Sequence, residues 1–326
     1  MIETEIQEMI KICVKNRASD MYIIPSDKGC LVKYRTLNNY HNLNSYSEKK
    51  MIQMNNFLKF KANMILSETR RPQFGTFQWQ IEHEKVNCRI SSVGDFLGRE
   101  SIVIRFIYSN TDVPLLQLLP NQFQQLINAC GSGGLILFSG PMGSGKTTTM
   151  YQLAEMIQNQ RTILTIEDPV EIQNPNFIQL QVNDKANMTY AELLKVGLRH
   201  HPDIFIIGEI RDEVTANAAI KAAMSGHLIL STVHARNAVG TIKRLENLGV
   251  SRDDLNRTLQ AVSYQRLIET TQGGSGVLFD ILAGQKLESV LEGTFNQKIV
   301  LERWHDSLDQ CIKKNIITIE TANNFK

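Results

Sequence analysis

The sequence lacks several features that would place it in a specialised class of protein. It has no run of about 18 apolar residues, and its first 16 residues lack the basic segment and apolar core of a secretory signal. Its five cysteines are far apart and form no CxxC pair, which argues against zinc and against a disulfide framework. We therefore expect a protein of the reducing cytoplasm that meets any membrane from outside.

The sequence also lacks a strong charge of one sign. The formal net charge is +2, and there are only two tryptophans, so there is no basic, aromatic-rich signature of a nucleic-acid surface. Apolar residues make up 42% and charged residues 21% of the 326 positions, as in ordinary globular proteins. This length favours two domains, and no direct binding of nucleic acid is expected.

The first 108 residues predict a small α+β domain. Apolar residues spaced as on one face of a helix begin at Ile2 and end at Val14. Two strands around a turn are predicted in 20–36, a helix through 48–66, and further strands through 74–107.

Residues 109–120 are predicted to form a linker, because they carry turn formers and two prolines. From residue 121 to 326, apolar strands alternate with helices, which predicts a parallel sheet covered on both faces. Beyond about residue 240 the pattern indicates a mainly helical C-terminal part. The predicted fold class is therefore α/β, with a smaller α+β domain in front.

A phosphate-binding loop lies between a predicted strand, LILFSG, and a predicted helix, TTTMYQLAEMI. It satisfies G-x-x-x-x-G-K-[ST] in full, and its glycines let backbone N–H groups turn towards phosphate oxygens at the positive end of the helix. We expect the lysine to reach the β- and γ-phosphates of ATP and the first threonine to ligate Mg²⁺. The predicted nucleotide-binding residues are Gly140, Pro141, Met142, Gly143, Ser144, Gly145, Lys146, Thr147 and Thr148, with Thr147 as the metal ligand.

Glu209 ends another apolar strand, DIFIIGE. A carboxylate at the carboxyl end of a strand beside the phosphate loop can polarise the attacking water, so Glu209 is the predicted catalytic base. The aspartate that holds Mg²⁺ in many P-loop enzymes would stand at position 208, which is glycine here. We therefore expect the metal to depend more on Thr147, the phosphates and water.

Two further polar clusters flank predicted strands. Glu167, Asp168 and Glu171 follow TILTI, where they can order metal-bound water or the nucleophile, or merely form an acidic turn that caps a helix. His227 and His234 bracket the strand LILSTV, where they can sense the γ-phosphate or a neighbouring subunit, or play a structural part.

These motifs together resemble the secretion ATPases of type II secretion and type IV pilus assembly. The matching segments are GPMGSGKTTTMY, TIEDPVE, GEIRD and GHLILSTVHARNA, in the same order and spacing, and weaker matches such as Ala18-Ser19-Asp20 extend towards the N-terminus. The resemblance implies a RecA-like P-loop core behind a PAS-like N-terminal domain. It also implies a homohexamer at the inner face of the cell membrane, working on an inner-membrane platform protein.

In that family, arginines of the N-terminal domain reach the nucleotide when the hexamer closes. The segment that begins at Arg89 resembles the arginine strand, so Arg89 and Arg105 are candidates for this role, and Arg99 fits less well because its spacing is one residue longer. A guanidinium that neutralises the transferring phosphoryl group accelerates related reactions by about 10³–10⁵. Hydrolysis would then depend on domain closure.

The sequence departs from the family pattern at Tyr22 and Ile24, where a histidine and a glutamate are usual, and it has no four-cysteine zinc insert. A short, zinc-free chain most resembles the ComGA-type competence ATPases of Gram-positive bacteria, which power a pilus for DNA uptake. A pilus retraction ATPase is the nearest rival. From other classes, a nucleic-acid translocase and a non-hydrolysing assembly scaffold stay open.

Overall fold

The computed structural model describes residues 2–36, 39–81, 84–108, 115–183, 186–293 and 297–325. The chain forms two compact units, Met1–Ser109 and Asn110–Lys326. None of the described helices combines the length and the apolar composition that crossing a bilayer requires.

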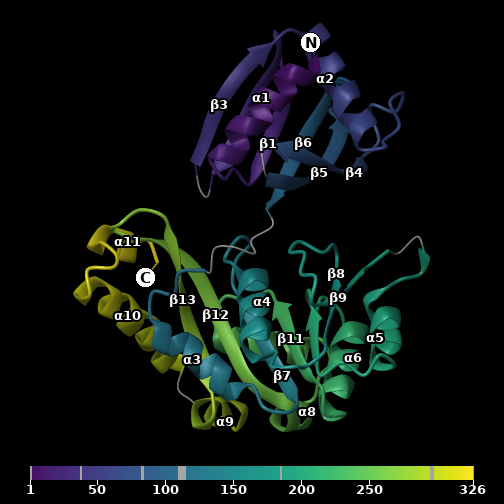
Figure 1. Ribbon diagram of the computed structural model, residues 1–326. Coiled ribbons are helices and arrows are strands. Elements are labelled where there is room, and N and C mark those ends of the chain that lie inside the picture. The colour runs from purple at the N-terminus through teal and green to yellow at the C-terminus, as the bar shows by residue number, and fades with distance from the viewer. Residues whose placement is uncertain are drawn as a thin grey trace. The chain divides into compact units, whose positions relative to one another are not determined.

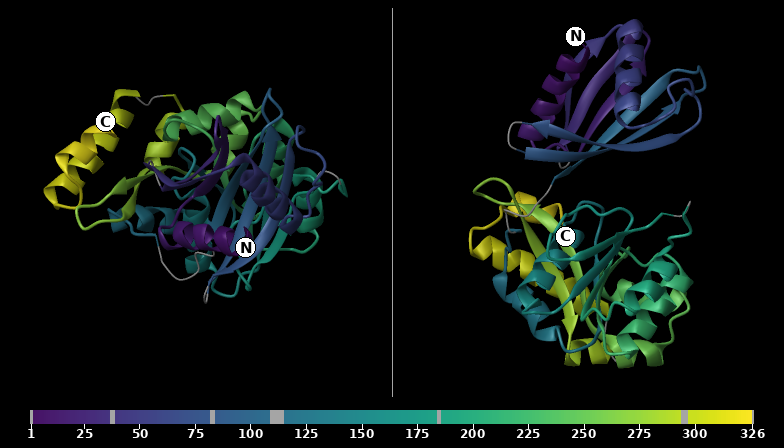
Figure 2. Two further views of the ribbon diagram at one scale, coloured as in Figure 1. Left: turned by 90° about the horizontal axis from the view of Figure 1, so that it is seen from above. Right: turned by 45° about the vertical axis from the view of Figure 1, so that its right-hand side comes forward.

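The first unit is an antiparallel sheet with two helices packed on one face, which can be followed in Figure 2. Its six strands are ordered β3-β2-β1-β6-β5-β4. The predicted first helix and the predicted hairpin are confirmed, whereas β3 was missed because its side chains are mostly polar and exposed. The elements are α1 (Ile2–Lys15), β1 (Asp20–Ser26), β2 (Gly29–Thr36), β3 (Asn39–Tyr46), α2 (Glu48–Lys61), β4 (Gln73–Ile81), β5 (Glu84–Gly94) and β6 (Glu100–Tyr108).

The core of this unit lies between the helices and the sheet. Ile10 of α1 and Leu58 of α2 are fully buried there together with Ile104 of β6. Because side chains alternate along a strand, Arg105 and its neighbour on β5, Arg89, point to the opposite face of the sheet.

The second unit is a three-layer α/β structure (Figure 1). Its seven strands are ordered β13-β12-β7-β11-β10-β8-β9, and all neighbours are parallel except β12 and β13. One face is covered by α3 and α4, and the other by α5 to α9. The elements are α3 (Pro120–Ala129), β7 (Gly134–Ser139), α4 (Lys146–Ile157), β8 (Ile163–Glu167), β9 (Ile178–Gln181), α5 (Tyr190–Leu198), β10 (Ile204–Ile207), α6 (Glu213–Met224), β11 (Leu228–Val233), α7 (Ala238–Asn247), α8 (Arg252–Thr258), β12 (Leu259–Glu269), β13 (Ser275–Ala283), α9 (Gln285–Leu291), α10 (Gln297–Lys313) and α11 (Ile319–Asn323).

The α/β class and the parallel sheet are confirmed, and most of the regular structure beyond residue 240 is helical as expected, but a hairpin within it was not predicted. Residues 259–283 form the hairpin β12–β13, which extends the sheet beside β7. Its strands mix apolar and polar residues without clear alternation, because several polar side chains such as Gln265 are buried. The glycine turn at Gly273-Gly274, where both φ angles are positive, was the available signal for a hairpin.

The outer edge of β13 is covered by side chains and by the segment that precedes α3. The Leu118 N–H donates to the Val277 carbonyl at 3.0 Å, and the Val277 N–H donates to the Leu116 carbonyl at 2.7 Å. Of the predicted linker, 109–114 lies outside the described residues, and these contacts place the following residues against the second unit.

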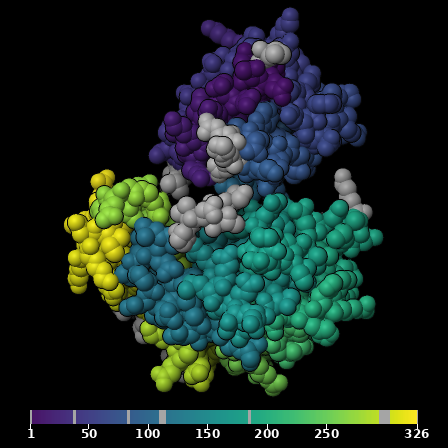
Figure 3. All heavy atoms as spheres, viewed as in Figure 1, coloured from purple at the N-terminus to yellow at the C-terminus, as the bar shows by residue number. Residues whose placement is uncertain are grey.

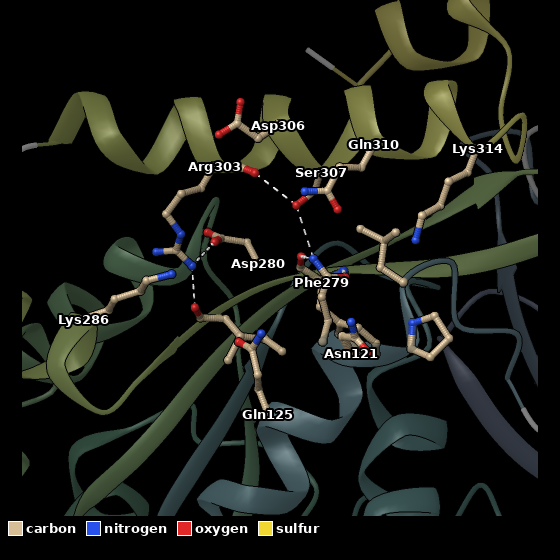
Figure 4. Close-up of a pocket in the computed structure, with 14 residues that line it drawn as sticks. Asn121, Gln125, Phe279, Asp280, Lys286, Arg303, Asp306, Ser307, Gln310 and Lys314 are labelled. Carbon is tan, nitrogen blue, oxygen red and sulfur yellow. Dashed lines mark hydrogen bonds and ion pairs between the residues drawn. The ribbon is translucent and has the colours of Figure 1, made fainter.

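The side-chain amide of Gln122 pairs with the backbone of β13 as a neighbouring strand would. Its amide donates to the Phe279 carbonyl at 2.6 Å and accepts from the Phe279 N–H at 3.1 Å. Arg303 of α10 donates to the Ile281 carbonyl and pairs with the buried Asp280 at 2.6 Å. These groups surround a polar cavity of about 370 Å³ (Figure 4), where α10 lies against α3 although the two are far apart in sequence (Figure 3).

Candidate active site

The loop from Gly140 to Gly145 joins the end of β7 to the first turn of α4. Gly140, Gly143 and Gly145 all have positive φ, a region that residues with a Cβ rarely adopt. A Cβ at Gly140 would also lie 2.4 Å from the Gln265 carbonyl oxygen, so no larger residue fits there. The loop is thereby shaped to turn backbone N–H groups towards an anion at the helix N-terminus.

Gln265 supports this loop from β12, and sequence reasoning missed it. Its side chain is fully buried and donates to the Ser144 carbonyl at 2.8 Å and to the Thr149 hydroxyl at 2.9 Å. A glutamine within an apolar segment was the only signal in the sequence.

Lys146 is folded back onto its own loop. Its ammonium donates to the carbonyls of Gly140 at 3.0 Å and Pro141 at 2.9 Å. Burial lowers the pKa of Lys146, while the nearby carboxylates of Glu209 and Glu171 act in the opposite direction. The lysine is thus held at the mouth of the loop with acidic groups close to it.

Thr147, the predicted metal ligand, faces the acidic segment. Its hydroxyl donates to a carboxylate oxygen of Glu171 at 3.5 Å, so the first turn of α4 and the segment after β8 meet at the loop. A hydroxyl and a carboxylate are the hard oxygen donors that Mg²⁺ prefers, so these residues fit this ion.

Glu209 follows β10, at the same end of the parallel strands as the phosphate loop. Its carboxylate accepts from Arg211 and lies 3.6 Å from Nε2 of His234. Arg211 also lies 3.7 Å from the Asp168 carboxylate. The structure thus brings Glu209, Asp168 and His234 together. Arg211 connects Glu209 to Asp168, a role that was not predicted from the GEIRD motif.

The three acidic residues after β8 face different ways. Glu167 is buried, and its carboxylate accepts from the Tyr151 hydroxyl at 2.5 Å, while Asp168 faces Arg211 and Glu171 faces Thr147. Burial raises the pKa of Glu167, and the hydrogen bond from Tyr151 opposes this shift. Asp168 and Glu171 therefore lie towards the loop and Glu209, whereas Glu167 belongs to the packing of α4 on the sheet.

The structure does not bring His227 to the phosphate loop. The residue precedes β11, whose first residue pairs with the first residue of β7. It therefore lies at the amino ends of the strands, opposite to the phosphate loop. Its ring contacts the Ala222 carbonyl at 3.1 Å and packs edge-on against Phe205. These contacts are those of a structural histidine.

The candidate arginines lie in the first unit. Arg89 and Arg105 are paired neighbours on β5 and β6, and Nε of Arg105 donates to the buried Asp20 carboxylate at 2.9 Å. Arg99 instead bonds Asp95 at 2.9 Å within the β5–β6 turn.

The second unit therefore brings together an anion-binding loop, a lysine, a hydroxyl and a carboxylate at the carboxyl ends of its parallel strands. These groups are the ones that transfer of a phosphoryl group to water requires.

Comparison with known proteins agrees with this chemistry. Residues 1–291 match the family described as "Type II/IV secretion system protein". Competence protein ComGA of Streptococcus pneumoniae is 35% identical over 100% of this chain and 99% of its own length. ComGA of Bacillus subtilis is 32% identical over 99% of this chain and 97% of its own length. Type II secretion system protein E of Pectobacterium carotovorum is 34% identical over 81% of this chain and 54% of its own length.

Solved structures share the fold at lower identity. The Legionella pneumophila ATPase DotB superposes with a TM-score of 0.76 at 17% identity, covering 99% of this chain and 95% of that one. The pilus retraction motor PilT, solved with bound ADP, gives a TM-score of 0.74 at 24% identity, covering 98% and 96%. The fold is thus that of RecA-like P-loop ATPases.

Proposed function

Because this chain belongs to the type II/IV secretion system protein family, we propose that it is the motor that assembles a type IV pilus-like competence pseudopilus for DNA uptake. It is a nucleotide-binding ATPase of this family. The observation that carries the catalytic part of the proposal is the position of Glu209, which follows β10 at the carboxyl ends of the parallel strands, where the phosphate loop leaves β7.

The residues divide the reaction between them. Backbone N–H groups of 140–145 hold the β- and γ-phosphates of ATP, and Lys146 leaves its loop carbonyls to neutralise them. Glu209 holds the water in line with the γ-phosphorus and takes its proton, while the bond from that phosphorus to the β-phosphate oxygen breaks. Arg211 and His234 fix the direction of the Glu209 carboxylate.

Thr147, with Glu171 behind it, would hold Mg²⁺, which when bound neutralises the phosphate charge. Asp168 lies where it can order water around this centre, on the far side of Arg211 from Glu209.

The motor works as a homohexamer in the cytoplasm, peripheral to the inner face of the membrane, and drives an inner-membrane platform protein. In this ring, Arg89 and Arg105 of one subunit meet the nucleotide of another and make hydrolysis depend on closure. The Asp20 carboxylate supports this assignment, since it fixes Arg105 at the Nε atom.

The first test is ATP hydrolysis by wild type and Glu209→Gln, with the mass of each in solution. We expect Glu209→Gln to bind ATP and form hexamers but to lose turnover by a factor of about 10² or more, because the general base is gone. Glu288→Gln, the same change at an exposed site on α9, is the control and should hydrolyse normally.

Normal turnover by Glu209→Gln would refute its role, and no hydrolysis by wild-type hexamers would favour the scaffold. In cells, loss of the gene should abolish pili and DNA uptake. Accumulation of pili would instead identify a retraction motor.

A further inference from the structure

Tyr190 stands at the start of α5, directly beside the strand end that carries Glu209. Thr189 caps this helix by accepting from the Glu192 N–H at 3.3 Å, which fixes the position of the first turn. A Cβ built at Gly208 would lie 3.0 Å from the Tyr190 hydroxyl oxygen. The hydroxyl thus takes up the space in which a side chain at position 208 would start.

Tyr190 also lines a cavity of about 380 Å³ next to the proposed catalytic base. Asp168, Tyr190, Glu209 and Arg211 line it together with the N-terminus of α6. A cavity of this size with several polar groups has room for water. The cavity thus leaves space for a water molecule beside Glu209.

The charges around Tyr190 favour the protonated form of its hydroxyl. Burial raises the pKa of its hydroxyl, and the carboxylates of Glu209 and Asp168 raise it further, against a smaller opposing effect of Arg211. The phenol therefore keeps its proton at neutral pH and can donate it in a hydrogen bond to a carboxylate.

We propose that Tyr190 is a positioning residue for hydrolysis, whose hydroxyl, beside Gly208, donates through a water of this cavity to the Glu209 carboxylate and orients it. This inference rests on the proposed function, since it assigns Glu209 as the base. It also gives a physical reason for glycine at 208 in this chain, because a larger residue would push the hydroxyl away.

The test is Tyr190→Phe, which keeps the ring and removes the hydroxyl. We expect kcat for ATP hydrolysis to fall about tenfold, as for loss of one hydrogen bond to a charged group, with KM for ATP and Tm unchanged. Tyr264→Phe, whose ring packs against Trp304 on the β12–β13 side, should keep the wild-type kcat.

Gly208→Ala supplies a second measurement on the same contact. Alone it should lower kcat, because its methyl group displaces the hydroxyl, whereas in the Tyr190→Phe background it should add little, since the crowded atom is absent. Additive effects would overturn the inference.

Wild-type kcat in Tyr190→Phe would also overturn it, as would a fall in Tm together with loss of ATP binding, which indicates a packing role. No hydrolysis by the wild type would instead reject the proposed function, and this inference with it.

Discussion

Glu167 shows how burial separates a carboxylate from its acidic neighbours. It is 3% exposed and bonded to Tyr151, which in turn accepts from the Gln179 amide at 2.7 Å. The sequence alone groups Glu167 with Asp168 and Glu171 because all three follow one strand. Only the packing of α4 against the sheet distinguishes their roles.

Glu167→Gln should change how stability depends on pH. In the wild type the folded pKa of Glu167 lies above its ordinary value of 4.5, so above that pH the unfolded chain loses a proton that the folded chain retains. This lowers the wild-type free energy of unfolding as pH rises, by up to about 1.4 kcal/mol per pH unit.

The variant lacks this loss, so its stability relative to wild type should increase as pH rises above about 4.5, until the pH reaches the folded pKa of Glu167. Urea unfolding at several pH values measures the difference. A difference that does not vary with pH would show that Glu167 ionises in the folded protein as it does in the unfolded chain.

The phosphate loop could be predicted from sequence residue by residue because its chemistry is local: glycines, lysine and threonine follow one another at fixed spacing. Tyr190 and Gln265 could not, because each contacts a segment far away in the chain, and the contact of Arg211 with Asp168 likewise joins two distant segments. Gln265, for example, supports Ser144 from 121 residues away.

At the scale of elements, Gln122 replaces a neighbouring strand for Phe279 of β13. Gln122→Ala would leave both the N–H and the carbonyl of Phe279 without these bonds, at a cost of about 1–3 kcal/mol in the free energy of unfolding. Urea denaturation measures this loss.

Gln125→Ala is the matched control, since Gln125 lies on the same helix and lines the same cavity, and the described part of the chain shows no side-chain hydrogen bond for it. Its effect should stay within about 0.5 kcal/mol. Equal effects of the two variants would show that the hydrogen bonds with Phe279 add nothing to the free energy of unfolding.

Elements with strong periodicity were predicted well. The strands β7, β8, β10 and β11 are buried on both faces and therefore read as apolar runs. The strands β3, β12 and β13 were not predicted, because β3 is polar and β12 and β13 contain polar residues that tertiary contacts satisfy. In these strands, the groups that bond the polar residues come from other parts of the chain.

At the scale of the whole molecule, the proposed ring predicts complementation between two inactive variants. Arg105→Ala lacks the arginine but retains Glu209, and Glu209→Gln retains the arginine. If the arginine acts on a neighbour's nucleotide, mixed hexamers contain some interfaces with both groups, so mixing and reassembly should restore part of the ATPase activity.

Glu209→Gln reassembled with itself is the control. Absence of recovery, with mixed hexamers demonstrated by mass, would contradict action between subunits.

The segment that leads into the second unit is hydrogen-bonded to β13 through Leu116 and Leu118. β13 pairs with β12, and Gln265 of β12 holds the carbonyl of Ser144 in the phosphate loop. A mechanical load carried into the second unit through this segment would therefore reach β13 and, through β12, the Ser144 carbonyl of the phosphate loop. Tension along this segment would thus act on hydrogen bonds that lead to the loop that binds the nucleotide.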